Sequence, residues 1–544
     1  MVKRNITLGT LRHLAKIDNP QEYKLFVLTR SDKYITESLE GGHNDIAKAL
    51  YEEFGDEFRC ASVANRIWFQ FIDHKWEQIE NGIFLRKKIS EDIVKRFAKA
   101  GIKLLQDSIS ANKDDQKQIH SKLKQINKMI CNLKSATYKN NVMKECEEVF
   151  YDKKFLKMLD TNPYLFGFNN GVYDLKLNKF RRGIPDDYIS RSAPIDYIDY
   201  NESDEKVSRV HSFLEKIFPD KSLREYFMNT SSDIFVGGNQ EKIALFWTGE
   251  GDNGKSVTQL FFEKMLGNLA VKPSTTLITG KKPSSGSANP ELARAGNGVR
   301  WMVLEEPGED EHINIGTLKH LTGNDSYLAR DLFQKGKETP EIHPMFKLVF
   351  ICNNLPKLKY SDKATWNRIR VIPFESTFCK PEISSIPETI EEQFRQKRFP
   401  MDKKFHEQIP ELLSAFAWVL LEHRKNITVR IEPEKVRQAS EKYKRQNDVY
   451  SQFLEENIVE DNNVKNILSL ADIYSSFKLW YRESIPNQSI PIRSDLENYL
   501  IKVWGNPERG KKWHGYRLYN DEDDKKEIDP TNLVNYDRLL KQPL

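Results

Sequence analysis

Residues 246–266 read FWTGEGDNGKSVTQLFFEKML, which passes from an apolar run through a glycine-punctuated loop into a helix-like pattern. The segment from Gly249 to Ser256 fits the phosphate-binding pattern G-x-x-x-x-G-K-[ST]. The apolar run IALFW before it and VTQLFFEKML after it match the strand and the helix that this pattern requires. A glycine-rich turn with an incidental lysine is the alternative. The strand–loop–helix context favours a loop that holds a nucleotide.

Each residue type in this loop has a role in binding phosphate. Glycines let backbone N–H groups turn inward around a triphosphate, and the start of the following helix adds the positive end of its dipole. Lys255 is expected to reach the β- and γ-phosphates, and the hydroxyl of Ser256 to ligate Mg²⁺. The expected binding residues are Gly249, Gly251, Asn253, Gly254, Lys255 and Ser256.

Two adjacent carboxylates follow the loop by about 50 residues, at the end of the apolar segment GVRWMVLEEPG. Nucleotide hydrolysis needs one acid that holds the metal and one base that activates water, at the end of a neighbouring strand. Alternation along a strand assigns Glu305 to the metal and Glu306 to the base, with the reverse assignment open. The alternative to a catalytic pair is that both glutamates are ordinary solvated residues at a strand end.

Further polar residues follow the next two apolar segments. KLVFICNNLPKL ends in an amide pair that can bridge a γ-phosphate and the attacking water, although Asn353 and Asn354 also suit an ordinary turn. WNRIRVIPF contains Arg368 and Arg370. A guanidinium can stabilise the charge that develops in phosphoryl transfer, often from an adjacent subunit. For Arg370 we favour a surface salt bridge.

Composition narrows the classes of protein that remain. The 544 residues are 39% hydrophobic, enough for several domains, and their net charge of +5 indicates a polyanionic partner only weakly. No apolar run is long enough to span a membrane and MVKRNITLGT lacks a signal-peptide core, so we expect an intracellular, soluble protein without a membrane partner. The five cysteines form no C-x-x-C pair, which argues against zinc and a disulfide framework.

Changes in composition divide the chain into five regions. A small α/β region at 1–84 contains the helix-like NDIAKALYEEFG and the strand-like RIWFQFIDHKW. Region 85–225 combines helices, predicted for about 85–160, with short strands joined by tight turns in NPYLFGFNNGVYDLKLNKF. A nucleotide-binding core at 226–380, a helical connector at 381–447 with a polar stretch near 430–448, and a compact segment at 448–544 follow.

Four motifs in this order, Glu305–Glu306, LKHLTGNDSYLARDLF, FICNNLP and WNRIRVIPF, resemble those of superfamily III helicases. More narrowly, the likeness is to the helicase half of the viral and phage primase-helicases, as in poxviruses and other nucleocytoplasmic large DNA viruses. It covers most of residues 85–380. The resemblance implies an α/β fold with an AAA+ type motor on a central parallel sheet, preceded by a helical collar and a small α/β region.

The resemblance further implies a DNA helicase of viral replication that assembles as a homo-hexameric ring, hydrolyses ATP with Mg²⁺ at subunit interfaces and moves along single-stranded DNA to open a fork. It makes Asn353 the γ-phosphate sensor and Arg368 a finger that acts on the neighbouring subunit, and it lets Lys319 face a nucleotide. The family often has two adjacent arginines where this chain has Asn367–Arg368. A primase and a polymerase of the same replisome are candidate partners, at a viral replication site in the host cell.

Two segments are expected to contact DNA. The family carries basic residues into the ring pore on a hairpin, and FQKGKETPEIH fits with Lys335 and Lys337 at its tip, where a solvated hairpin is the alternative. Near the C-terminus, LSLADIYSSFKLWYRE and IRSDLENYLIKVWG precede the basic RGKKWHGYRLYN, an order typical of a winged helix. Its aromatic stripe is expected to be core, and a protein-docking module is the alternative. The candidate DNA contacts are Arg493, Lys511, Lys512 and Arg517.

Two other functions fit parts of this pattern. A DNA-binding replication scaffold or loader, in which ATP only switches conformation, would not need the hydrolytic set of Glu306 and Arg368. A P-loop kinase or GTPase is disfavoured because no guanine-reading N-K-x-D follows the loop. We find no paired-acid strand motif for nucleotide polymerisation, so the family's primase half is not expected in this sequence, which is either a whole product or the motor portion of a longer chain.

Overall fold

The computed structural model describes residues 7–40, 42–109, 112–280, 288–307, 311–329, 341–358, 363–380, 386–427, 429–461, 463, 465–485 and 490–519. The chain forms two compact units, one from residues 1–356 and 368–436 and the other from residues 357–367 and 437–544. In the described parts of the chain, no helix has the length and apolar character needed to cross a membrane.

The first unit begins with three helices and a small antiparallel sheet. Asn19 separates the first two helices, and its side chain caps the second, whose first residue is proline. The elements are α1 (Leu8–Asp18), α2 (Pro20–Glu37), α3 (His43–Phe54), β1 (Phe58–Ser62), β2 (Ile67–Ile72) and β3 (Lys75–Glu80), with the strands in the order β1-β2-β3. The helix at NDIAKALYEEFG and the strands in RIWFQFIDHKW are confirmed, whereas α1 and α2 were not recognised individually.

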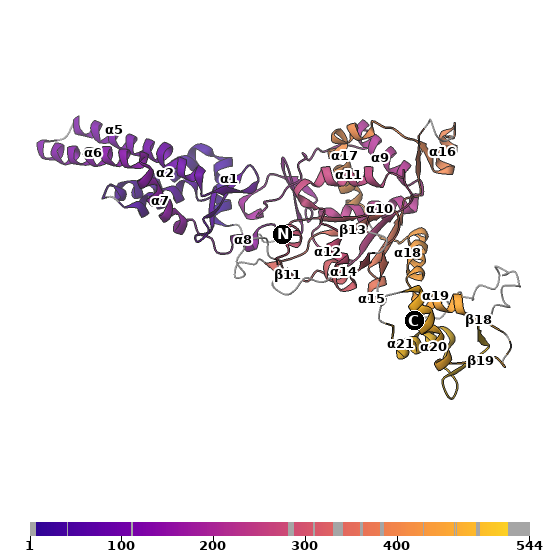
Figure 1. Cartoon of the computed structure of the whole chain (residues 1–544). Coiled ribbons are helices and arrows are strands. Elements are labelled where there is room, and N and C mark those ends of the chain that lie inside the picture. The colour runs from indigo at the N-terminus through magenta and orange to yellow at the C-terminus, as the bar shows by residue number, and fades with distance from the viewer. Residues whose placement is uncertain are drawn as a thin grey trace. The chain divides into compact units, whose positions relative to one another are not determined.

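The next segment is helical, as predicted for residues 85–160. It comprises α4 (Ile83–Lys88), a π-helical turn (Ile89–Ile93), α5 (Val94–Ile109), α6 (Lys113–Lys134), α7 (Ala136–Val149) and α8 (Phe155–Met158). Figure 1 shows α5 and α6 side by side, and Gly101 of α5 faces Ile126 of α6. A Cβ at position 101 would lie 3.5 Å from Ile126 Cγ2, an ordinary van der Waals contact, so this packing does not depend on glycine.

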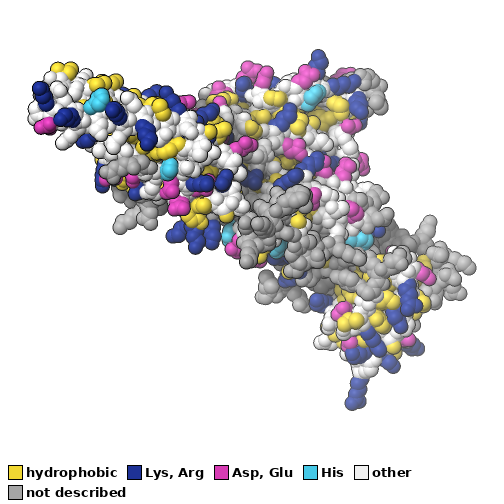
Figure 2. Space-filling model, turned by 60° about the vertical axis from the view of Figure 1, so that its left-hand side comes forward, with side chains coloured by type: hydrophobic (Ala, Val, Ile, Leu, Met, Phe, Trp, Pro, Cys, Tyr) yellow, Lys and Arg dark blue, Asp and Glu magenta, His cyan; other side chains and the backbone are white. Residues whose placement is uncertain are grey.

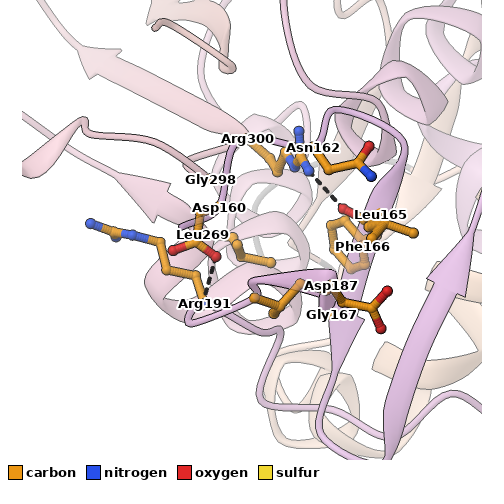
Figure 3. Close-up of a pocket in the computed structure, with 11 residues that line it drawn as sticks. Asp160, Asn162, Leu165, Phe166, Gly167, Asp187, Arg191, Leu269, Gly298 and Arg300 are labelled. Atoms are coloured by element: carbon orange, nitrogen blue, oxygen red, sulfur yellow. Dashed lines mark hydrogen bonds between the residues drawn. The ribbon is translucent and has the colours of Figure 1, made fainter. Parts of the chain in front are cut away.

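The predicted short strands follow as an antiparallel sheet of β4 (Leu165–Phe168), β5 (Gly171–Asp174) and β6 (Lys179–Arg181). The fully buried Arg300 joins this sheet to the centre of the unit, because its Nη2 donates to the carbonyl of Leu165 at 2.8 Å (Figure 3). Burial lowers the pKa of Arg300 to about 10, and desolvation raises the pKa of the half-buried Asp160. The cavity beside them measures about 10 Å³, room for about one water molecule.

A five-stranded parallel sheet forms the centre of the first unit, with the strand order β15-β7-β13-β9-β8. Its strands are β7 (Ala244–Thr248), β8 (Ala270–Val271), β9 (Trp301–Glu305), β13 (Lys347–Cys352) and β15 (Ile369–Pro373). Every residue of the central β13 is buried, as expected for a parallel strand covered on both faces. The predicted α/β class with a central parallel sheet is confirmed.

Apolar side chains join the sheet to the surrounding helices. Phe262 stacks on Trp301 with ring centroids 5.5 Å apart and meets Phe416 edge-on. The main helices are α9 (Glu205–Ile217), α10 (Lys221–Ser232), α11 (Lys255–Leu266) and α17 (Phe405–Lys425). Shorter elements are α12 (Thr276–Thr279), α13 (Pro290–Arg294), β10 (His312–Ile313), α14 (Ile315–Thr322), β11 (Tyr327–Leu328), β12 (Glu341–Ile342), β16 (Thr377–Cys379), α16 (Ile390–Gln396) and β17 (Arg398–Pro400). The polar stretch near 430–448 contains the helix α18 (Glu434–Gln446).

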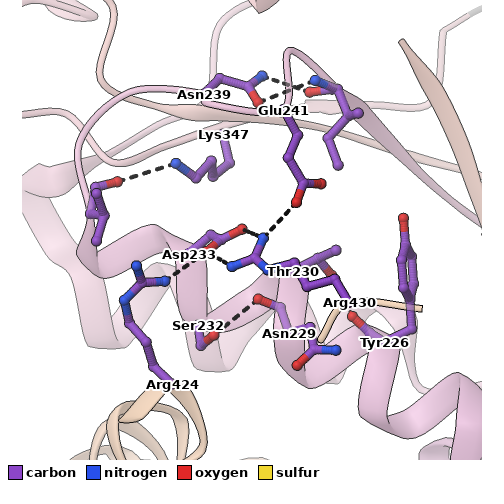
Figure 4. Close-up of polar contacts among 12 residues, drawn as sticks. Tyr226, Asn229, Thr230, Ser232, Asp233, Asn239, Glu241, Lys347, Arg424 and Arg430 are labelled. Atoms are coloured by element: carbon purple, nitrogen blue, oxygen red, sulfur yellow. Dashed lines mark hydrogen bonds and ion pairs between the residues drawn. The ribbon is translucent and has the colours of Figure 1, made fainter. Parts of the chain in front are cut away.

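A polar network closes the amino ends of β7 and β13 (Figure 4). Asp233 accepts hydrogen bonds from Arg424 at 2.7 Å and from Arg430 at 2.5 Å, and Arg430 also donates to Glu241 at 2.9 Å. The buried Lys347 donates to the carbonyls of Val236, at 3.2 Å, and Gly238. Burial lowers the pKa of Lys347 to about 8. These contacts fix α17 and the residues after it to the sheet.

The second unit has its own core and the predicted order of two helices followed by a basic segment. The two strands of that segment pair with earlier strands and not with each other, so they do not form the predicted hairpin. Ile473, Phe477, Trp480 and Tyr481 are all buried, so the aromatic stripe is core as expected. Its elements are β14 (Lys357–Leu358), α15 (Lys363–Trp366), α19 (Val449–Asn457), β18 (Ile458–Glu460), β19 (Ile467–Ser469), α20 (Leu470–Ser484), α21 (Arg493–Trp504), β20 (Lys512–His514) and β21 (Tyr516–Leu518). The strands pair antiparallel as β18-β21 and β19-β20.

Candidate nucleotide-binding site

The loop from β7 to α11 depends on two glycines for its shape. Gly249 has φ of +150° and Gly254 has φ of +83°, backbone conformations that side chains rarely adopt. A Cβ at Gly249 would lie 2.6 Å from the carbonyl oxygen of Phe374, and one at Gly254 would lie 2.2 Å from Ile217 Cδ1. A Cβ at Gly251 would have nothing within 4 Å. The conformation of the loop therefore requires glycine at 249 and 254 and does not require it at 251.

Lys255 is buried at the start of α11 and its ammonium lies inside the loop. Nζ donates to the carbonyl of Gly249 at 2.5 Å, to Asn253 Oδ1 at 3.2 Å and to Asn353 Oδ1 at 3.1 Å. Burial lowers the pKa of Lys255, against a smaller opposing effect of Glu306. The arrangement places a partly desolvated cation where phosphate oxygens would compensate it.

The acidic pair lies at the same edge of the sheet as the loop. In the register of the parallel strands, Ile351 pairs with Glu305 and Cys352 pairs with Thr248, so β7, β9 and β13 end together. Glu305 forms an ion pair with Lys272. Glu306 is exposed and has φ of +46°, and its backbone N–H donates to the carbonyl of Ile351 at 2.8 Å.

The backbone at Glu306 is informative because left-handed non-glycine residues are strained and concentrate at functional sites. The hydrogen bond to Ile351 is the last one of the parallel pairing between β9 and β13, and the positive φ of Glu306 then bends the chain away from the strand direction. Glu305 is half-buried at the strand end, whereas Glu306 is exposed. Glu306 stays the candidate base, and the division of roles between the two carboxylates stays a prediction.

The residues proposed for Mg²⁺ are oxygen donors. Ser256 is exposed in the first turn of α11, and Glu305 is half-buried at the end of β9. Within the described ranges, no group of three or more His, Cys, Asp and Glu side chains is arranged to hold a metal ion. A serine hydroxyl and one carboxylate fit Mg²⁺ that takes its other ligands from phosphate and water. Lys319 is half-buried on α14. That this lysine faces a nucleotide stays a prediction.

The two asparagines after β13 are not equivalent. The side-chain oxygen of Asn353 accepts the hydrogen bond from Lys255, and its backbone carbonyl accepts one from Thr248 Oγ1 at 3.2 Å. These contacts position Asn353 between the loop and the end of the central strand. The geometry therefore favours Asn353 over Asn354 as the residue that would sense a γ-phosphate.

The two arginines lie away from this edge. Arg368 immediately precedes β15, and its carbonyl accepts a hydrogen bond from Ala244 N, at the amino end of β7. The five residues of β7 separate that point from the phosphate loop, a distance of roughly 15 Å. Arg368 therefore begins far from the phosphate loop of its own chain, and its action on a neighbouring subunit stays a prediction. Arg370 forms an ion pair with Glu432 at 2.7 Å, which confirms the salt bridge favoured for it.

The expected DNA contacts are only partly described. Lys335 and Lys337 lie outside the described residues, between β11 and β12, which pair antiparallel. In the second unit, Arg493 begins α21 and is exposed, as is Lys512. Lys511 forms an ion pair with Glu497 at 2.6 Å, and Arg517 lies 3.8 Å from Asp461. Arg493 and Lys512 are the stronger candidates because carboxylates lie next to the other two.

Sequence reasoning missed Lys272, which follows the short strand β8 and pairs with Glu305. A lone lysine after a two-residue strand carries no motif. Its significance comes from the pairing of β8 with β9, which puts residues after Val271 next to the end of the acidic strand. Only the order of the strands in the sheet reveals this contact.

Several known proteins are similar to this chain in sequence. A family model described as "D5 N terminal like" matches residues 47–219. The chain is 34% identical to "Putative helicase 022R" of frog virus 3 (isolate Goorha), over 90% of this chain and 59% of that protein. It is 36% identical to a "Putative helicase" of Acanthamoeba polyphaga mimivirus, over 92% and 52%, and 23% identical to a "Putative primase" of African swine fever virus, over 92% and 54%. The chain spans about half the length of these curated relatives.

Fold and site define an α/β protein with a phosphate-loop motif at the carboxyl edge of a parallel sheet. The chain belongs to the primase-helicase family of nucleocytoplasmic large DNA viruses. Among solved structures, the C-terminal region of NrS-1 aligns with 54% of this chain and 61% of its own, with a TM-score of 0.34 and 14% identity. The JCV helicase aligns with 46% of this chain and 63% of its own, with a TM-score of 0.24 and 16% identity.

Proposed function

We propose that the chain is the motor of a viral replicative DNA helicase, an AAA+ type ATPase of superfamily III that works as a homo-hexameric ring. The observation that carries this proposal is the convergence of Lys255, Asn353 and the Glu305–Glu306 pair at one edge of the sheet. A conformational switch would need the lysine alone. The complete hydrolytic set supports turnover of ATP.

Each residue of the site has a separate task in this proposal. Lys255 would bind the β- and γ-phosphates, and Asn353 would hold the γ-phosphate and the attacking water in line. Ser256 and Glu305 would hold Mg²⁺, which when bound neutralises phosphate charge. Glu306 would accept the proton of the attacking water.

A ring is the assembly that this geometry favours. Because Arg368 begins at the sheet edge opposite the phosphate loop, it can stabilise the charge of phosphoryl transfer only across a subunit interface. A closed ring gives every loop such an arginine from its neighbour. Single-stranded and forked DNA are the proposed substrates, with a primase and a polymerase of the same replisome as partners, at a site of viral replication in the host cell. The names of the relatives support this class of function.

The test compares ATP hydrolysis with and without single-stranded DNA, together with fork unwinding, for the parent chain and Glu306→Gln. We expect DNA-stimulated hydrolysis and strand separation in the parent, and loss of both in the variant with ATP binding retained. Glu215→Gln, which removes one exposed carboxylate of α9, is the matched control and should behave as the parent. DNA binding with hydrolysis but without unwinding would instead favour an ATP-switched scaffold or loader.

A further inference from the structure

Outside the nucleotide site, the densest positive charge lies on the hairpin of α5 and α6. Residues 94–134 contain ten Lys and Arg against three Asp and Glu, a net charge of +7, whereas the whole chain has +5. The other residues together are therefore slightly acidic. Figure 2 shows Lys and Arg side chains along this part of the molecule, interspersed with hydrophobic ones.

Four of the lysines form one stripe along α6. Lys113, Lys117, Lys124 and Lys128 are spaced i, i+4, i+11 and i+15, which the helical period places within about 60° of one another around the axis. All four are exposed, and the stripe extends over about 22 Å at the helical rise. The buried residues of the helix, Ile126, Met129 and Leu133, lie on the opposite side.

Acidic side chains neutralise little of this stripe. Lys117 is 3.8 Å from Asp114, and both side chains are almost fully exposed, so the pair is weak. In the portion of the chain that the structure describes, no other ion pair involves the four lysines. By contrast, Arg96 of α5 bonds Asp32 at 2.6 Å and lies 3.3 Å from Glu53, which gives that cation a structural role.

We propose that this lysine stripe binds the phosphate backbone of DNA. This inference rests on the proposed function, in which DNA is the substrate. It adds a DNA contact on α6 to the contacts proposed above. A row of like charges along one helix, with only the weak Lys117–Asp114 pair to neutralise it, suits a ligand that carries regularly repeated negative charge over the same length, as nucleic acid does. Flexible lysines that contact phosphates read no base sequence, so binding here is independent of sequence.

The first test measures how DNA binding by the full chain depends on salt. One variant replaces the four stripe lysines, Lys113, Lys117, Lys124 and Lys128, by Gln. The matched control replaces by Gln four exposed lysines of α9, of α11 and of the start of α17, which are Lys206, Lys216, Lys264 and Lys404. Binding is measured without nucleotide on a single strand and on the corresponding duplex. Each lost phosphate contact lowers the slope of log K against log salt by roughly 0.7 for a single strand and 0.9 for a duplex. We expect the slope of log K against log salt to be less steep by about 3 in the stripe variant than in the parent. The control variant should have the slope of the parent.

The second test uses a cysteine that the chain already carries. Cys131 is exposed and lies on the same stripe, seven residues after Lys124, whereas the other four cysteines are buried. A thiol-attached photoreactive probe at Cys131 should crosslink to DNA at low salt. Crosslinking should disappear at high salt and in the Gln variant.

The outcomes separate this proposal from the proposed function. If parent and stripe variant have equal slopes and no crosslink forms at Cys131, the proposal that the stripe binds DNA is overturned. An acidic protein would then be the partner that fits its charge. If that parent still hydrolyses ATP and unwinds a fork, the helicase proposal survives. A reduced slope and a crosslink in a chain that never unwinds DNA would support the stripe and reject the helicase. A parent chain that binds no DNA would overturn both.

Discussion

At the residue scale, the candidate site contains contacts that nucleotide binding has to exchange. Lys255 donates to Asn353 and to loop carbonyls, and Lys272 occupies a side of Glu305 that a metal ion would need. The proposed binding of ATP and Mg²⁺ would have to break these contacts, and the free energy of breaking them would lower the affinity for both.

Replacing Lys272 with Met should lower the Mg²⁺ concentration that gives half-maximal ATP hydrolysis. The variant removes the cation that competes for Glu305, and an exposed ion pair of this kind is worth about 0.2–1 kcal/mol, so we expect a decrease of up to about fivefold. A Mg²⁺ titration of steady-state hydrolysis measures it. Lys272→Arg keeps the charge and should resemble the parent. An unchanged or increased Mg²⁺ requirement in Lys272→Met would contradict the competition.

Lys347 should make stability depend on pH in the alkaline range. Its folded pKa of about 8 lies below the 10.5 of an unperturbed lysine, so between these values the unfolded chain binds more protons. The free energy of unfolding should rise as pH increases from 8 to 10.5, by up to about 3 kcal/mol, and this contribution should be flat below pH 8. Denaturant unfolding of parent and Lys347→Met across this range measures the difference.

The pH dependence of that difference is the diagnostic quantity. The variant lacks the titrating group and should lose this rise, so its stability relative to the parent should fall between pH 8 and 10.5. Lys264→Met, at an exposed site of α11, is the control and should keep the parental profile. Parallel profiles for parent and Lys347→Met would show that Lys347 titrates as in the unfolded chain.

At the element scale, the strand–loop–helix from β7 to α11 makes different demands on its three glycines. Gly249→Ala and Gly254→Ala should each abolish measurable ATP binding, because both positions have positive φ and a Cβ would collide with Phe374 or Ile217. A Cβ at position 251 would enter open space, so Gly251→Ala should bind ATP with an affinity within about threefold of that of the parent. A fluorescent ATP analogue measures all three. Equal losses at 249 and 251 would refute this account of the loop.

The sequence predicted elements well where composition or an apolar run was distinctive. The region that contains α5, α6 and α7 was predicted helical because it is nearly free of glycine and proline and rich in Lys, Gln, Asp and Ile. The strand before the phosphate loop was predicted from its apolar run. The helix α2 was missed because its apolar residues form no clear single face, whereas α1 was missed although its apolar residues do lie on one face. The helix α18 was described as a polar connector because charged residues dominate it. Local patterns cannot reveal packing that arises from distant segments.

At the scale of the whole molecule, the separation of Arg368 from the phosphate loop predicts complementation between subunits. Glu306→Gln and Arg368→Ala chains should each be inactive alone. In a mixed ring, some interfaces combine an intact Glu306 with an intact Arg368 from the neighbour, and these should hydrolyse ATP. Mixing the two variants before ring assembly should therefore restore a measurable fraction of parental activity.

Two controls make the mixing experiment decisive. Lys255→Ala mixed with Glu306→Gln disables the same face of the site in both chains and should restore nothing. Activity that does not recover in the Glu306→Gln and Arg368→Ala mixture, although the chains assemble together, would show that Arg368 does not act across an interface.

The sequence alone determined the phosphate loop, the order of the polar motifs and the α/β class, because each depends on residues that are neighbours in the chain. Only the tertiary structure decided which of those residues meet. The parallel register brings Asn353 to Lys255 across 98 residues, and the strand order places Lys272 beside Glu305 and Arg368 at the far edge. Local sequence sets backbone preference, whereas the pairing of strands distant in the chain sets which side chains share a site.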